Sequence, residues 1–228
     1  MKNPSDPNSR TPSSRGGVSP IPPQCQTVAQ GICHRVKNDL QTVANLLILA
    51  DPYTESSADL VRAVEERISA LSQAYALFSE NAANVTLDVL GQKLAQKVSS
   101  RLGHAVTINN QLPQTALSLR LCCVFSLWLQ EMLTNACLHG LPEIKNPTIT
   151  LKGELGEDEF WLEVLDNGKG LAPGFTPLTS QRLGLRLAYG LTEMDLNGKL
   201  ELLPACPGLA ARLTVPVREF DRLNQNAW

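Results

Sequence analysis

His34 is the residue with the clearest chemical potential near the start of the chain, in the segment 33–41 (Cys-His-Arg-Val-Lys-Asn-Asp-Leu-Gln). A largely neutral imidazole near neutral pH can act as a nucleophile. Apolar residues recur every three or four positions from Val28 to Leu47, which predicts a helix over this region. His34 lies off that apolar stripe, so its imidazole is expected to face solvent.

Three polar neighbours of His34 could support such chemistry. Arg35 and Lys37 could neutralise an anionic group held at the imidazole, and Asn38, one helical turn further on, could orient the ring. Asn38 could equally be a solvated helix residue.

Glu131 and Asn135 form a second candidate pair, four residues apart on a long apolar helix expected over 117–139. This spacing places a carboxylate and an amide on one helix face. Such oxygen ligands suit Mg²⁺, which keeps waters and substrate phosphates in its remaining positions. The alternative interpretation is a polar stripe on a surface helix.

The loop Asp166-Asn-Gly-Lys-Gly170 follows an apolar strand and could form a third element of the site. Asp166 could accept a hydrogen bond from an exocyclic amine, and Gly168 and Gly170 would allow a ligand to approach the backbone. An ordinary turn remains the alternative. Gly184, at the start of a later helix, could present backbone amides to a phosphate.

Together these motifs resemble the nucleotide-binding domain shared by histidine kinases, gyrase and Hsp90. The segment 131–140 resembles its N box, 166–170 its G1 box and 182–186 its G2 box. The resemblance implies Mg²⁺ coordination by Asn135, with Glu131 positioning water or the metal, and adenine recognition by Asp166. The ATP-binding positions it implies are Asn135, His139, Asp166, Gly168, Gly170, Leu183, Gly184 and Leu185.

Segment 33–41 in turn resembles the H-R-V-K-N-N-L-Q motif of the HisKA_2 subfamily of histidine kinases. The resemblance covers about residues 26–218 and implies that His34 is phosphorylated from Mg-ATP. It also implies transfer of the phosphoryl group to an aspartate of a separate response regulator. The sequence departs from the family pattern at Asp39, Leu138 and Leu209.

A second amphipathic run precedes the nucleotide-binding motifs. Its stripe comprises Leu60, Val64, Ile68, Leu71, Tyr75 and Phe78. Charged residues, Arg67 among them, are expected largely off this stripe. Two such helices form a hairpin that cannot cover both of its own stripes, so a homodimer with a four-helix bundle is expected.

The remaining pattern predicts an α/β sandwich with a mostly antiparallel sheet. Helices are expected over 87–102, 117–139 and 183–196, and strands over 105–109, 148–153, 159–165, 199–203 and 211–217. The fold class is therefore α+β, a dimeric helical hairpin followed by a Bergerat-type ATP-binding domain. The expected organisation is a tail over 1–24, the hairpin over 25–83, the ATP-binding domain over 84–220 and a tail over 221–228.

Bulk composition excludes some other classes of protein. With 20 basic and 22 acidic side chains the net charge is −2, which does not favour nucleic-acid binding. Neither a membrane span nor a signal peptide is expected, so the prediction is a cytoplasmic protein. The 24-residue polar start is too short for a sensor, which predicts a possible separate sensor protein as partner.

Two other functions remain open at this point. One is a histidine phosphotransferase relay protein with a degenerate ATP domain, although a relay has no need of Glu131, Asn135, Asp166 and Gly170 together. The other is an anti-sigma-type serine kinase on the same ATP-binding fold, which leaves the hairpin with His34 without a role.

Overall fold

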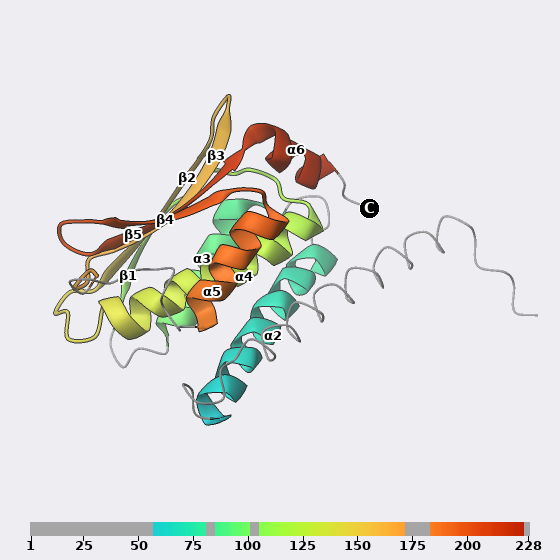
Figure 1. The fold of residues 1–228 in the computed structure, drawn as a ribbon. Coiled ribbons are helices and arrows are strands. Elements are labelled where there is room, and N and C mark those ends of the chain that lie inside the picture. Colours follow the sequence, from blue (N-terminus) through green and yellow to red (C-terminus); the bar gives the residue numbers. More distant parts are fainter. Residues whose placement is uncertain (1–56, 81–84, 101–104, 172–182, 226–228) are drawn as a thin grey trace, which may run out of the picture.

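A computed structural model describes residues 57–80, 85–100, 105–171 and 183–225 of the chain. It shows an α/β sandwich in which helices cover one face of a sheet (Figure 1). The expected α+β class and its sandwich architecture are thereby confirmed. His34 and its neighbours in the first predicted helix lie outside the described residues.

The sheet has five strands in the order β1-β2-β3-β5-β4. Their bounds are Thr107–Gln111 for β1, Thr148–Leu155 for β2, Glu159–Asp166 for β3, Lys199–Pro204 for β4 and Leu209–Pro216 for β5. β1 pairs with β2 in parallel, and the other three pairings are antiparallel, as predicted. The register places Asp166, the last residue of β3, opposite Ile149 and Leu209.

The covering helices lie close to their predicted positions. They are α3 (Leu87–Ser99), α4 (Leu119–Asn135) and α5 (Leu183–Gly190). The last two continue into short π-helical turns, η1 (Ala136–Gly140) and η3 (Leu191–Asp195). π-Helical turns of this kind occur often at functional sites.

Helix α4 is the centre of the structure. Its residues from Leu121 to Leu133 are all buried, because α2, α3, α5 and α6 as well as the sheet pack around it. By length and composition alone, Leu119–Gly140 could cross a membrane, but 78% of its apolar window is buried inside the protein. That burial is the arrangement of a core helix.

The C-terminal residues differ from the prediction. A tail was expected from 221, but the helix α6 spans Val217–Gln225. It buries Phe220 and Leu223, and the Phe220 ring stacks on Phe160 with centroids 4.6 Å apart. The prediction was wrong because a nine-residue helix directly after a strand has no start signal of its own, and its two apolar contacts are visible only once folded.

The second predicted amphipathic helix is present as α2 (Ser57–Glu80), but its buried face differs from the predicted stripe. α2 packs along α4 and buries Arg67, Ala70, Leu71, Ala74 and Leu77. Ile68, expected on the stripe, is 47% exposed, whereas Arg67, expected off it, is 2% exposed. Ala70 and Ala74 allow α2 to lie close to α4. Arg67 can be buried because it donates a hydrogen bond to Glu131 of α4.

Candidate functional site

An open pocket lies between the end of α4, the end of β3, the first turn of α5 and the strands β4 and β5. It holds about 610 Å³ of empty space, which includes the solvent at its open mouth. Its lining residues are Met132, Asn135, Ala136, His139, Gly140, Val164, Asp166, Gly170, Leu171, Leu185, Leu202, Leu209 and Ala211. The wall is mostly apolar with a few polar groups, which is typical of a site for a flat aromatic ligand.

Asp166 is the acidic group of this pocket. It is 5% exposed, and the backbone N–H of Gly168 donates a hydrogen bond to its Oδ1 at 2.8 Å. Burial raises the pKa of the Asp166 carboxyl above its usual value, and hydrogen bonds from the backbone of Gly168 and Leu209 offset part of that rise. The second oxygen, Oδ2, could accept a hydrogen bond from a ligand amine.

Two glycines hold the chain close around Asp166. A Cβ at Gly140 would lie 3.0 Å from Asp166 Oδ1, and a Cβ at Gly168 would clash with the carbonyl of Gly140. The N–H of Lys169 donates to that same carbonyl at 3.1 Å. Gly168 therefore serves the packing of the loop against η1. That role differs from the close approach to a ligand for which the sequence suggested it.

Gly170 has a positive φ of 70° and lines the pocket. This backbone conformation strongly favours glycine. The position therefore turns the chain at the pocket rim.

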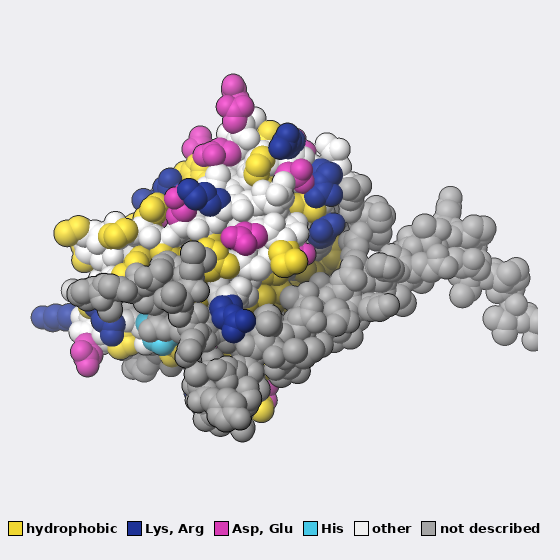
Figure 2. Space-filling model, in the orientation of Figure 1, with side chains coloured by type: hydrophobic (Ala, Val, Ile, Leu, Met, Phe, Trp, Pro, Cys, Tyr) yellow, Lys and Arg dark blue, Asp and Glu magenta, His cyan; other side chains and the backbone are white. Residues whose placement is uncertain are grey.

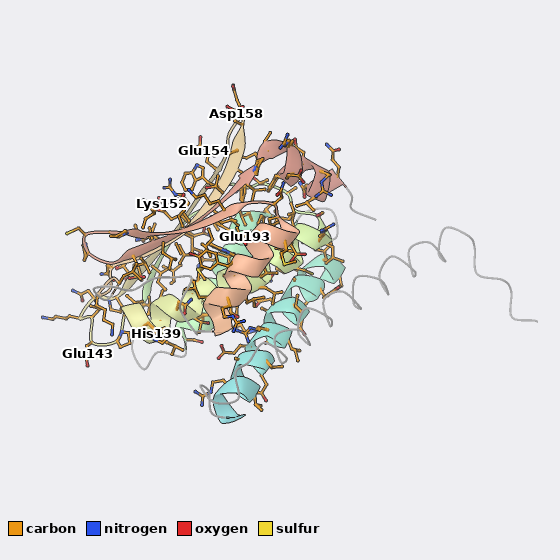
Figure 3. The ribbon with its side chains drawn as sticks, in the orientation of Figure 1. His139, Glu143, Lys152, Glu154, Asp158 and Glu193 are labelled. Carbon is orange, nitrogen blue, oxygen red and sulfur yellow. The ribbon has the colours of Figure 1, made fainter. Side chains whose placement is uncertain are left out.

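Asn135 and His139 enter the pocket from the end of α4. Asn135 is the last residue of α4, and His139 lies within η1. Figure 3 shows His139 at this end of the helix, near the edge of the sheet. Their spacing of four residues places both side chains on one side of the helix, so both line the same pocket.

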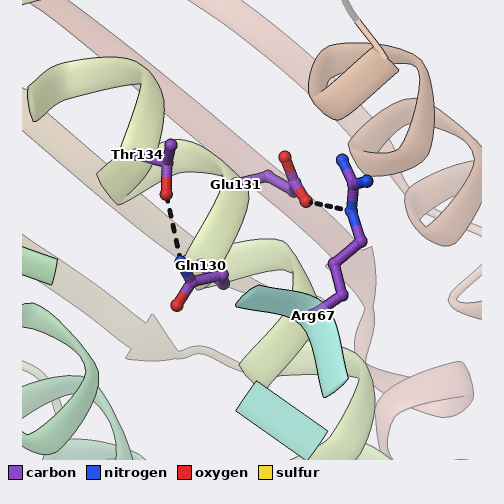
Figure 4. Close-up of polar contacts among 4 residues, drawn as sticks. All are labelled: Arg67, Gln130, Glu131 and Thr134. Carbon is purple, nitrogen blue, oxygen red and sulfur yellow. Dashed lines mark hydrogen bonds and ion pairs between the residues drawn. The ribbon is translucent and has the colours of Figure 1, made fainter. Parts of the chain in front are cut away.

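Glu131 does not line this pocket. It is 7% exposed, and its Oε1 accepts a hydrogen bond from Arg67 Nε of α2 at 2.6 Å (Figure 4). A Cβ at Gly184 would clash with its other oxygen, Oε2. Glu131 therefore lies behind the pocket, between α2 and the first turn of α5.

The structure brings together Asn135, His139, Asp166, Gly170 and Leu185 of the predicted site residues. Gly168 and Gly184 lie next to the pocket, and only the backbone of Leu183 is described. His34, Arg35, Lys37 and Asn38 lie outside the described residues. The described residues contain no group of three or more His, Cys, Asp or Glu side chains that could hold a metal ion.

Sequence reasoning missed the apolar wall of the pocket. Met132, Val164, Leu202, Leu209 and Ala211 all contribute to it. The alternation of buried residues along β3 and β5 could have placed Val164 and Ala211 on the inner face. Nothing in the sequence distinguishes inner-face residues next to a pocket from those in the closed core.

The surface in Figure 2 carries interspersed acidic and basic side chains. On this face of the described residues no broad basic field is visible.

Comparison with known proteins gives matches to histidine kinases. The model of a family described as HWE histidine kinase matches residues 32–111. The sensor histidine kinase PdtaS of Mycobacterium tuberculosis (strain ATCC 25618 / H37Rv) is 28% identical over 201 residues, which cover 84% of this chain and 40% of the relative. The blue-light-activated histidine kinase of Brucella ovis (strain ATCC 25840 / 63/290 / NCTC 10512) is 26% identical over 198 residues, covering 83% and 39%.

Solved structures show the same fold. The Erythrobacter litoralis EL346 blue-light activated histidine kinase superposes with a TM-score of 0.72 at 19% identity, covering 91% of this chain and 64% of that chain. The histidine kinase domain of the same protein gives 0.63 at 17% identity, covering 85% and 99%. The chain therefore has the fold of a histidine kinase domain.

The comparisons support the resemblance to histidine kinases but not the finer HisKA_2 name, because the matched family is described as HWE. The chain spans about two fifths of the length of the curated relatives it matches.

Proposed function

We propose that the chain is a protein-histidine kinase that binds Mg-ATP in the pocket at the end of α4. In this proposal His34 takes the γ-phosphoryl group and passes it to an aspartate of a separate response regulator. The relatives named above are described as histidine kinases, and this chain has the fold of the solved histidine kinase domain. The observation that carries the proposal is the pocket itself, where Asp166 and Asn135 both line a mostly apolar wall.

The pocket suits an adenine ring. The ring would lie against Leu185, Leu202 and Ala211, and Asp166 would accept a hydrogen bond from the exocyclic amine. A buried carboxylate rejects a ligand that lacks the matching donor, because the acceptor is then left unpaired. Asp166 would therefore give selectivity for adenine.

Asn135 would hold Mg²⁺ through its side-chain oxygen. Magnesium commonly takes one or two protein ligands and completes its octahedron with phosphates and waters. A single amide at the pocket rim is consistent with this, so the residues present fit the ion. Bound there, Mg²⁺ would neutralise charge on the transferred group. A direct metal role for Glu131 stays a prediction, and its ion pair with Arg67 makes a role behind the site the better interpretation.

The partners remain proposals too. We expect a homodimer through the hairpin, a receiver domain as phosphoryl acceptor, and a separate protein as the possible source of the signal. Ile68 and Val61 on α2 are 47% and 57% exposed, which leaves apolar surface on this helix for further packing. We also propose that the protein is cytoplasmic.

Incubation of the full chain with radiolabelled ATP tests the central step. A phosphoramidate is labile in acid and stable in base, which separates it from phosphoserine. His34→Gln should abolish labelling and leave ATP affinity unchanged. His139→Gln is measured beside it as a variant of the other predicted site histidine. If His34→Gln still incorporates acid-labile phosphate at the wild-type level, the assignment of His34 is wrong.

A relay protein would give a different result. It would be phosphorylated by a phosphorylated receiver domain but would show no binding of ATP in calorimetry. Absence of ATP binding by the folded wild type would therefore replace the kinase proposal with the phosphotransferase function.

A further inference from the structure

The ion pair between Arg67 and Glu131 is an unusual feature of the interface between α2 and α4. Both side chains are buried, at 2% and 9% side-chain exposure, and their Nε and Oε1 atoms are 2.6 Å apart. Arg67 belongs to the second helix of the hairpin, whereas Glu131 lies one turn before Asn135 on the helix of the pocket. The pair therefore connects the hairpin to the nucleotide site.

The pair also reaches the first turn of α5. Gly184 lies directly against Glu131 Oε2, and Arg67 Nη2 would lie 3.8 Å from a Cβ at that glycine. One carboxylate thus contacts elements of two kinds, a hairpin helix on one side and a helix that lines the pocket on the other. A shift of Arg67 that keeps this ion pair would move Glu131 relative to α5.

Stability alone does not account for this contact. A buried ion pair is weak evidence for stability, since well-packed apolar residues of similar volume often do as well or better. Among the described residues Arg67 Nη1 is buried without a hydrogen-bond partner, which adds a further cost. What the pair does supply is a fixed direction for the Glu131 carboxylate, because its Oε1 accepts from Nε of a rigid, planar guanidinium.

We propose that Arg67 is a positioning residue that holds Glu131 against the first turn of α5, so that phosphoryl transfer depends on the docking of the hairpin helix. This inference rests on the proposed kinase function. Neither Arg67 nor Glu131 lines the pocket, so the pair sets the rate of transfer and leaves ATP affinity unchanged. A change in α2 caused by a partner protein would reach the nucleotide site by this route.

Steady-state autophosphorylation of the full chain tests the proposal. Arg67→Met keeps the length and apolar stem of the side chain but removes the cation. We expect kcat to fall at least ~10-fold with KM for ATP within about threefold, the pattern of a lost transition-state interaction. Arg67→Lys restores the charge but not the planar guanidinium, so it should recover only part of kcat. A merely structural role would lower kcat only in proportion to the loss of folded protein, so kcat is expressed per molecule that binds ATP in calorimetry.

Two control variants lie on the same helix. Arg62→Met removes an exposed cation from α2, and Ser69→Ala removes the hydrogen bond that Lys97 Nζ of α3 donates to Ser69 Oγ at 2.5 Å. The first controls for the loss of charge and the second for a looser contact of α2. Both should keep wild-type kcat. A fall in kcat for Ser69→Ala equal to that of Arg67→Met would overturn the proposal.

A double-mutant comparison keeps the test decisive if Arg67→Met does not fold. The pair Arg67→Met with Glu131→Gln leaves no buried charge unpaired. If Arg67 acts through Glu131, this double variant has the same kcat as Glu131→Gln alone. A further tenfold loss in the double variant would show that Arg67 acts independently and would overturn the inference.

Labelling of the wild type distinguishes failure of the proposed kinase function from failure of the positioning role of Arg67. A folded wild type that does not label would contradict the proposed function itself. A wild type that labels, together with an Arg67→Met variant of equal kcat, would contradict the positioning role alone.

Discussion

Helix α4 begins at a closed, capped end and finishes at an end that is open to the pocket. At its start Ser118 caps the helix, accepting from the N–H of Leu121 at 3.2 Å, and donates its hydroxyl to the carbonyl of Leu223. At its finish the helix widens after Asn135 into η1 and faces the pocket.

The packing around the two ends differs in the same way. Near the start, the rings of Phe125, Phe160 and Phe220 stack, with Phe125 and Phe160 centroids 5.4 Å apart. Near the finish, the neighbours are the buried pair Arg67–Glu131 and the carboxyl of Asp166. The aromatic packing at one end of the helix therefore contributes stability. The other end has polar groups of the site in place of such packing. Substitutions at the two ends should therefore separate stability from function.

The largest effect is expected from Phe160→Ala at the closed end. The ring is fully buried, and its loss should lower the free energy of unfolding by about 3–5 kcal/mol. Urea unfolding measures this change. Leu155→Ala, at a 40% exposed position in the neighbouring strand, is the control and should cost far less. A loss below about 1 kcal/mol for Phe160→Ala would refute the conclusion that the closed end of α4 contributes the stability.

At the open end, Asp166→Asn should act on binding and not on stability. The amide keeps the shape and can still accept from Gly168, but it no longer offers a second carboxylate oxygen to an amine. We expect ATP affinity in calorimetry to fall at least ~10-fold, or about 1.4 kcal/mol, with the melting temperature nearly unchanged. Asp158→Asn, at an exposed position in the β2–β3 turn, controls for the loss of charge. Equal affinity in wild type and Asp166→Asn would remove Asp166 from the adenine contact.

The raised pKa of Asp166 gives a pH dependence at the open end. The ionised carboxylate is the form that accepts from the amine, so affinity is full above its pKa and declines as pH falls through it. Because burial raises that pKa, the decline begins at a higher pH than for an exposed aspartate. Calorimetry from pH 8 downward measures it, and Asp166→Asn should show a flatter profile. Identical profiles would show that another group titrates.

Ionisation of Asp166, which favours ATP binding, has the opposite effect on the stability of the fold. Since the folded state holds the proton of Asp166 more tightly than the unfolded state, ionisation of this residue disfavours folding. Its contribution to stability is therefore present below the unfolded pKa and is lost as pH rises through the folded one. Asp166→Asn should remove that loss, so at neutral pH the variant should be at least as stable as wild type in urea unfolding.

The smallest effect is expected from the cap of α4. Ser118→Ala removes the acceptor for Leu121 N–H and the donor to Leu223, and should cost about 1 kcal/mol. Ser79→Ala at an exposed position near the end of α2 is the control, with an expected change within about 0.5 kcal/mol. If both substitutions lower the free energy of unfolding equally, the stability of the closed end does not depend on the Ser118 cap.

Sequence periodicity was enough for the sandwich and for most of its elements. The strands β2 and β3 were predicted within two residues because a Gly-Glu-Asp turn separates two apolar segments. The polar residues of the pocket were also predictable, since Asn135, Asp166 and Gly170 belong to motifs with recognisable spacing. These features depend on local sequence.

What could not be predicted depends on contacts between distant segments. Arg67 has the sequence context of a surface charge, and only Glu131, 64 residues later, makes its burial tolerable. The helix α6 is amphipathic in its own sequence, but only the folded structure shows that Phe220 completes an aromatic cluster. Likewise, the widening of α4 after Asn135 has no turn residue or proline to announce it.

The burial of α4 has a consequence for synthesis on the ribosome. This apolar segment emerges before β3, α5 and α6, which cover part of it, while α2 and α3 have already been made. The nascent chain can therefore shield one side of the helix at once, but the other side stays uncovered until Phe220 has been translated. During that interval the segment resembles a substrate for chaperones and for the membrane-insertion machinery, because its composition would allow it to cross a bilayer.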